Sequence, residues 1–193
     1  QILEDIGLMK MLPGMTVINT CDFNQTKSAT KEISEFYGPV YLRFGRPKVP
    51  NFTDPNKKFE IGKGIQLSSG SDISLFATGH MVWESIIACE NLKKEGISVD
   101  LINITTIKPL DIEIILDSVS KTKLVVTAEE HQKLGGLGAS ISQLLSEKMP
   151  TFIEMVAVDD SFGESGKPKE LLKKYKLDSL NIELACKKAL LKK

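Results

Sequence analysis

The sequence predicts an α/β protein with a mostly parallel sheet covered by helices on both faces, in three layers, preceded by part of a second α/β domain. Two observations carry this prediction. From Ser71 onward, short apolar runs alternate with helix-like segments through short connections, which is the pattern of a parallel sheet. Before that point, a helix–strand–helix–strand pattern runs into a proline-containing stretch without periodicity, which indicates an incomplete second unit and a linker.

The first unit is expected to hold two helices and two strands, in the order 3–12, 15–18, 24–37 and 40–42. Leu12-Pro13-Gly14 ends the first helix, and Asp22 or Asn24 is a suitable cap for the second. Two strands alone bury too little surface to be stable. This half-sheet therefore needs support from another domain or another chain.

The second unit is expected to be more regular. Its strands are predicted at 73–77, 99–104, 123–128 and 152–158, and its helices at 81–94, 111–120, 137–148, 167–175 and 178–192. Residues 47–64 read as a linker, with a short edge strand around Ile61 and Ile65. The predicted division is 1–48 for the partial domain, 49–68 for the linker and 69–193 for the second domain.

The composition excludes several classes of protein. Among 193 residues, 25 lysines and arginines balance 25 aspartates and glutamates, which argues against a nucleic-acid partner. No apolar run reaches the ~18 residues of a membrane span, so no membrane association is expected. Cys21, Cys89 and Cys186 lie far apart and form no metal-ligand cluster, as expected for reduced thiols in a cytoplasmic protein. The first residue is Gln1 rather than methionine, as expected of a fragment.

Residues 38–46 are the first candidate site. Gly38 and Pro39 precede a short apolar strand, and Arg43 and Arg46 follow at its carboxyl end, where open α/β sheets place their ligands. The planar fork of a guanidinium donates two parallel hydrogen bonds and suits a phosphate or a carboxylate. The alternative is that one arginine pairs with a structural carboxylate.

Two further segments follow predicted strands. In Thr78-Gly79-His80, the free N–H groups of a helix start can hold an anion. A tight strand-to-helix turn is the preferred explanation of the glycine, and His80 then has a capping or interface role. Glu129, Glu130 and His131 end a strand and precede a glycine-rich turn at 135–138. Paired carboxylates suit acid–base work, but an interface or a structural polar network is the preferred interpretation, and no catalytic residue is predicted. No metal ligand set is predicted.

Taken in order along the chain, these motifs resemble the transketolase family, above all its C-terminal half or subunit. The segments that carry the resemblance cover essentially the whole chain: Gln1…Asp5, Leu12-Pro13-Gly14-Met15-Thr16-Val17, Gly38 to Arg46, Ala77-Thr78-Gly79-His80, Ile107-Lys108-Pro109-Leu110-Asp111, Thr127-Ala128-Glu129-Glu130-His131 and Gly135-Gly136-Leu137-Gly138.

The resemblance implies that residues 1–48 are the second half of a pyrimidine-binding domain and residues 69–193 a transketolase C-terminal domain. In that family, thiamine diphosphate and Mg²⁺ bind between domains of two subunits, and the glutamate that activates the cofactor precedes the position of Gln1. No cofactor is therefore expected on this chain alone. An arginine at the end of the pyrimidine-domain strand binds the sugar phosphate, which matches Arg46 better than Arg43.

The implied function is the transfer of a two-carbon ketol unit between sugar phosphates, as part of a larger enzyme that is a homodimer or assembles with an N-terminal transketolase subunit. Deoxyxylulose-phosphate synthase and the β subunit of a 2-oxo acid dehydrogenase are the alternatives among enzymes. A module that only stabilises the dimer is the alternative from another class. The isolated chain is expected to be inactive.

Overall fold

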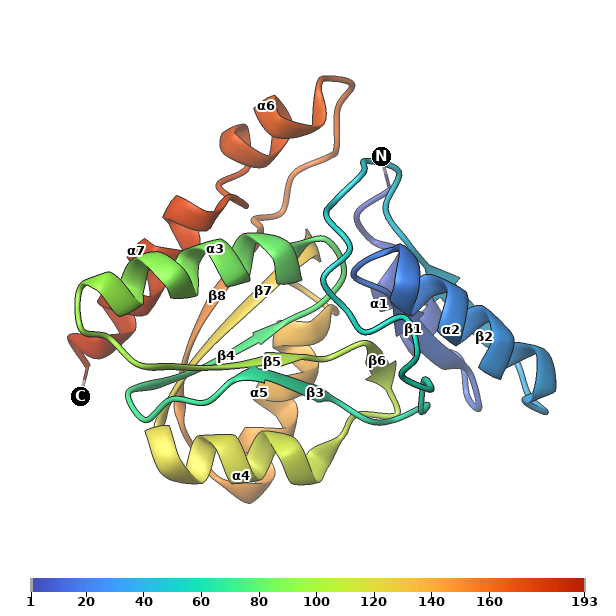
Figure 1. Ribbon diagram of the computed structural model, residues 1–193, viewed down its shortest axis with the longest axis horizontal. Coiled ribbons are helices and arrows are strands. Elements are labelled where there is room, and N and C mark those ends of the chain that lie inside the picture. The colour runs from blue at the N-terminus through green and yellow to red at the C-terminus, as the bar shows by residue number, and fades with distance from the viewer. Residues whose placement is uncertain (1, 193) are drawn as a thin grey trace.

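A sheet of five strands and a sheet of three organise residues 2–192, the part of the chain that the computed structural model describes (Figure 1). The large sheet has the order β3-β5-β4-β7-β8. Its strands are β3 (Ile65–Ser68), β4 (Ile73–Ala77), β5 (Val99–Asn103), β7 (Leu124–Gln132) and β8 (Phe152–Val158). Only the edge strand β3 runs antiparallel to its neighbour. This confirms the mostly parallel sheet.

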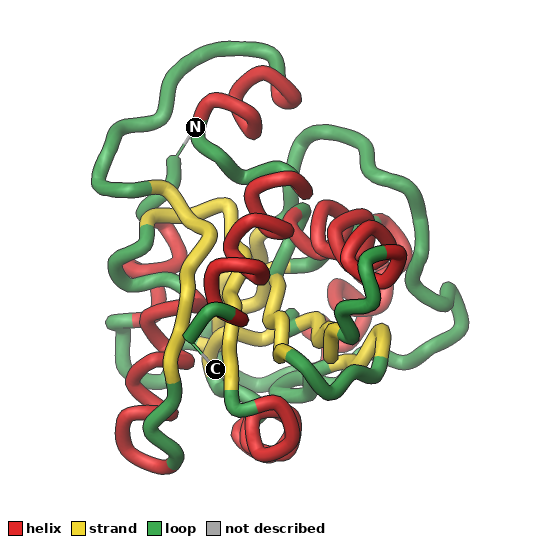
Figure 2. Tube along the Cα trace, turned by 90° about the vertical axis from the view of Figure 1, so that its left-hand side faces the viewer, coloured by secondary structure: helices red, strands yellow, loops and turns green. Residues whose placement is uncertain are grey.

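Helices cover both faces of the large sheet, as predicted (Figure 2). Four of them supply the two outer layers: α3 (Met81–Lys94), α4 (Ile112–Thr122), α5 (Leu137–Lys148) and α7 (Ser179–Leu190). Leu75 and its neighbours in adjacent strands pack in one apolar cluster with α3 and α7. Phe76 belongs to a second cluster with α4 and α5. Successive strand residues thus face opposite layers, which explains why these strands are apolar throughout. The short α6 (Pro168–Lys174) lies between β8 and α7 in sequence.

The small sheet contains one strand that was not predicted. β1 (Thr16–Asn19) is central and pairs in parallel with β2 (Val40–Arg43). On its other side it pairs antiparallel with β6 (Thr106–Lys108). The helices α1 (Asp5–Lys10) and α2 (Phe23–Glu35) complete this unit. β6 thus supplies the support that two strands alone require.

The β1–β6 pairing crosses the predicted domain boundary, because β6 lies within residues 69–193. Its last residue, Lys108, also donates from Nζ to the carbonyls of Lys10 at 2.9 Å and Leu12 at 2.7 Å. A lysine of the second unit therefore holds the end of α1. The division into 1–48, 49–68 and 69–193 stays a prediction.

One strand is longer than predicted. β7 was expected to stop at Ala128 but continues to Gln132. The extension has its own partners, since Gln132 is in register with Val158 and its N–H donates to the carbonyl of Leu3 at 2.7 Å. As a result, Glu129, Glu130 and His131 lie within the strand rather than beyond it.

The segment between the units is tied down although it has no regular structure before β3. Asp22 caps α2 by accepting from the N–H of Gln25 at 2.8 Å. The same carboxylate accepts from the N–H groups of Phe52 at 2.9 Å and Thr53 at 2.8 Å. The ring of Phe52 also stacks on Trp83 of α3, with centroids 5.8 Å apart. A helix cap of the first unit is thus also the anchor of the linker.

Every helix within residues 2–192 is too short or too polar to cross a bilayer.

Candidate functional site

The carboxyl ends of β1, β2, β4 and β7 face one another where the two sheets meet. Thr78 Oγ1 donates to the carbonyl of Asn19 at 3.3 Å, and Arg43 Nη2 donates to the carbonyl of Glu130 at 2.9 Å. We call residues 43–46, 78–80 and 129–131 the sheet junction. It contains all six side chains singled out from the sequence: Arg43, Arg46, His80, Glu129, Glu130 and His131.

The guanidinium of Arg43 is occupied by contacts within the chain. Its Nε lies 3.0 Å from Oδ2 of Asp5, and the two side chains are only 16% and 5% exposed. Tyr41 donates its hydroxyl to the same carboxylate oxygen at 2.8 Å. Burial, with this hydrogen bond, raises the pKa of Tyr41 to about 12. Arg43 thus has the contacts expected of an arginine paired with a structural carboxylate.

Arg46 has a different environment. It lies three residues beyond β2 and is exposed to solvent. Within residues 2–192, its guanidinium has no partner in a salt bridge or a side-chain hydrogen bond. These two residues are the only arginines in the sequence. Arg46 is therefore the one whose fork of N–H donors faces solvent.

His80 occupies the N-cap position of α3 but makes no capping hydrogen bond. The turn before it is tight, since Gly79 has φ = +58°. The ring lies beside Gly45, and its Nδ1 is 3.9 Å from Oε2 of Glu130. Burial lowers the pKa of His80, and the nearby Glu130 opposes this shift. The contacts of His80 are therefore with the other two segments of the junction.

Glu129 is fully buried in β7, and its carboxylate caps the start of α5. Its Oε2 accepts from the N–H of Leu137 at 2.6 Å, and its Oε1 accepts from the N–H of Gly138 at 2.8 Å. Carboxylates at this position stabilise a helix by binding its free N–H groups. Burial raises the pKa of Glu129 to about 7, against the effect of these hydrogen bonds and of Lys10. Both carboxylate oxygens of Glu129 are thus engaged by the N–H groups at the start of α5.

His131 connects β7 to α1. Its Nδ1 is 2.8 Å from the carbonyl of Gln132, and its Nε2 is 3.1 Å from the N–H of Gly7. A carbonyl only accepts and an amide N–H only donates, so the ring is neutral with its proton on Nδ1. Burial lowers the pKa of His131, and the hydrogen bond to the Gln132 carbonyl opposes this shift. These are the contacts of a structural polar network; a subunit contact at Glu129, Glu130 and His131 stays a prediction.

The metal that accompanies thiamine diphosphate needs oxygen or nitrogen ligands that lie close together. Within residues 2–192, no three His, Cys, Asp or Glu side chains come close enough to share a metal ion. Glu129 has the raised pKa that acid–base chemistry uses, but both of its oxygens are engaged.

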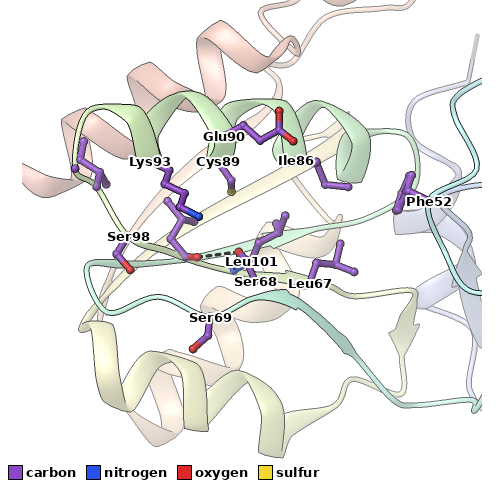
Figure 3. A pocket seen from close by; sticks show the side chains of 13 residues that line it. Phe52, Leu67, Ser68, Ser69, Ile86, Cys89, Glu90, Lys93, Ser98 and Leu101 are labelled. Atoms are coloured by element: carbon purple, nitrogen blue, oxygen red, sulfur yellow. Dashed lines mark hydrogen bonds between the residues drawn. The ribbon is translucent and has the colours of Figure 1, made fainter.

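A pocket of about 590 Å³ lies elsewhere, between α3 and the edge of the large sheet (Figure 3). Its walls are mainly apolar side chains, among them Phe52, Ile86 and Leu101. None of the six candidate side chains lines it. This pocket is therefore separate from the candidate site at the sheet junction.

Sequence reasoning missed Gly45 as a member of the junction and Asp5 as the partner of Arg43. Asp5 stands in a short helix whose partner, Arg43, is far along the chain, and no local pattern marks such a pair. For Gly45 a signal existed, because a glycine directly before Arg46 indicates close approach by another group.

The fold and the junction define a three-layer α/β module joined to part of a second α/β unit, and comparison with known proteins gives its family. The model of the family described as "Transketolase, C-terminal domain" matches residues 62–182. A putative transketolase C-terminal section from Methanocaldococcus jannaschii is 40% identical over 185 residues, covering 94% of this chain and 58% of the relative. The chain belongs to the transketolase family.

Two further relatives agree. The 6-deoxy-6-sulfo-D-fructose transketolase subunit SqwH from Clostridium sp. (strain MSTE9) is 38% identical over 180 residues, covering 93% of this chain and 56% of the relative. A solved structure described as "Split gene transketolase, inactive beta4 tetramer" superposes with a TM-score of 0.96 at 40% identity, covering 99% of this chain and 63% of that one. The chain spans a little more than half the length of these two curated relatives.

Proposed function

We propose that this chain is the C-terminal part of a thiamine-diphosphate-dependent transketolase, which moves a two-carbon ketol unit between sugar phosphates, and that Arg46 anchors a substrate phosphate. The observation that carries the proposal is the contrast between the two arginines. Arg43 is held by Asp5 and by the carbonyl of Glu130, whereas Arg46 is exposed beyond the end of β2. A guanidinium in that place binds a phosphate through two charge-assisted hydrogen bonds.

The other parts of the proposal concern the complete enzyme. Thiamine diphosphate, when bound there with Mg²⁺, stabilises the negative charge left on carbon after the C–C bond breaks. We assign no residue of this chain to its binding. The partner is a second copy of the complete chain or an N-terminal transketolase subunit, and the compartment is the cytoplasm. Relatives named as subunits and as a split-gene enzyme support such an assembly.

The test replaces Arg46 by alanine in the complete enzyme and compares phosphorylated with unphosphorylated sugar substrates. A hydrogen bond to a charged group contributes roughly 1.5–3 kcal/mol, so kcat/KM for phosphorylated sugars should fall about ten- to a hundredfold. Unphosphorylated sugars should be used as before. Lys148→Ala removes one exposed cation at the far end of α5 and is the control for a change in net charge. Equal losses on both kinds of sugar would refute the phosphate role.

The reaction class has its own test. The complete enzyme should convert ribose 5-phosphate with xylulose 5-phosphate and should not consume pyruvate. Pyruvate consumption without ketol transfer would instead indicate a deoxyxylulose-phosphate synthase or a 2-oxo acid dehydrogenase subunit.

A further inference from the structure

We propose that His80 is a positioning residue for Arg46: its ring, held beside Glu130, supports the backbone of Gly45 and so fixes the loop that presents the Arg46 guanidinium. The inference rests on the proposed function, because it assigns a support to the phosphate anchor. It adds to the Arg46 site a residue from the connection between β4 and α3, whereas Arg46 itself follows β2.

The contact between His80 and Gly45 is close. A methyl group added to the α-carbon of Gly45 would overlap the imidazole ring at Cε1, Nε2 and Nδ1. Gly45 does not have a left-handed backbone, since it is absent from the glycines with positive φ. Glycine is therefore needed at this position for space and not for its conformational freedom. The ring takes the place that a side chain would fill.

The loop, residues 43–46, has few other restraints within the part of the chain that the structure describes. Its first residue, Arg43, is fixed by Asp5, by the carbonyl of Glu130 and by the N–H of Thr20, which donates to the Arg43 carbonyl at 3.1 Å. Phe44 is 61% exposed, so its side chain packs poorly against the protein. No helix or strand follows Arg46 until β3. The ring of His80 is thus a close contact on the loop between its fixed end and Arg46.

The ring itself is largely buried beside Glu130. It is carried by the first turn of α3, its side chain is 11% exposed, and Glu130 Oε2 lies 3.9 Å from its Nδ1. The charged groups that face it are Glu130 from β7 and Arg43 from β2. Arg43, at the start of the loop, donates to the carbonyl of Glu130, and Glu130 lies beside the ring of His80. The loop and the ring that supports it are therefore connected through Glu130.

A looser loop should weaken binding of the phosphate more than the chemical step. Ordering a mobile side chain on binding reduces affinity about two- to tenfold, so His80→Ala should raise KM for phosphorylated sugars by that factor. The value of kcat and the use of unphosphorylated sugars should not change. A residue needed only for folding would lower activity on both kinds of sugar together.

The decisive experiment is a double-mutant cycle in the complete enzyme. Gly45→Ala alone should raise KM for phosphorylated sugars more than His80→Ala does, because its methyl group displaces the ring or the loop. In Gly45→Ala/His80→Ala the ring is gone and the methyl group has room, so KM should return to the His80→Ala value. Losses that multiply in the double variant would overturn the proposal. If Gly45→Ala does not fold, the double variant and His80→Ala still provide the comparison.

Arg46→Ala, measured in the same series, separates this inference from the proposed function. If Arg46→Ala selectively loses phosphorylated sugars but His80→Ala does not, the function stands and the role of His80 is refuted. If Arg46→Ala affects both kinds of sugar equally, the phosphate anchor is refuted and the role of His80 with it.

Discussion

Nε of Arg43 lies 3.0 Å from Oδ2 of Asp5, and this ion pair joins β2 to α1 in a place where both side chains are largely buried. Removing one partner of a buried pair leaves the other charge without compensation. We therefore expect Asp5→Asn to lower the free energy of unfolding by about 3–5 kcal/mol, as measured by urea denaturation. Asp117→Asn, at an exposed position of α4, is the control. Similar stabilities for the two variants would show that the pair contributes little.

The stability of the protein should depend on the ionisation of Glu129. Burial raises its pKa from the ordinary 4.5 to about 7, so the folded protein holds this proton more tightly than the unfolded chain. The contribution of Glu129 to the free energy of unfolding is therefore largest below pH 4.5 and falls as the pH rises to about 7. Denaturant titrations between pH 4.5 and 8 measure this change.

Glu129→Gln should remove this dependence and destabilise the protein by about 1–3 kcal/mol, because an amide has only one oxygen for the two N–H groups of α5. Glu147→Gln, at an exposed position of the same helix, should retain the wild-type dependence. Identical pH profiles for wild type and Glu129→Gln would contradict the assignment.

Both histidines should titrate below the ordinary pKa of 6.5, because burial lowers the pKa of His80 and of His131. The sequence contains only these two, so nitrogen NMR of the wild type and of His80→Gln assigns each ring. His131 should show a proton on Nδ1 throughout the neutral range, because its Nε2 accepts from Gly7. A dominant proton on Nε2 would contradict this network.

The 193-residue chain alone should not bind thiamine diphosphate and should have no activity. Residues 2–192 bring together no metal-binding group of side chains, and the carboxylate of Glu129 is occupied. Titration calorimetry with thiamine diphosphate and magnesium should give only heats of dilution. Saturable binding at micromolar concentration would show that this chain holds the cofactor.

The regular part of the fold was predictable because its signals are local. β4 and β8 were predicted with the bounds that the structure has, and α3 and α5 likewise. Each is an apolar run or an amphipathic helix bounded by turn residues. The clustering of the six candidate side chains was also foreseeable in part, since the carboxyl ends of parallel strands share one edge of a sheet.

β6 and the partner of Arg43 were not predictable for the opposite reason. Thr106, Ile107 and Lys108 form too short a run before Pro109 to be recognised as a strand, and their partner β1 is distant in sequence. Asp5 likewise meets Arg43 only after α1 and β2 have packed. Which arginine is buried and which is exposed depends on such distant contacts, so the sequence left both alternatives open.

The β1–β6 pairing also has a consequence during synthesis. β1 and its partner are separated by about 90 residues, so a ribosome adding about 5–20 residues per second completes β6 roughly 5 to 18 seconds after β1. During that interval the backbone edge of β1 that pairs with β6 has no partner within the nascent chain, and the first unit cannot close before α3 and β5 have been made. The order of translation thus leaves the first unit without part of its native contacts until β6 and the end of β7, which binds the carbonyl of Leu3, have been made.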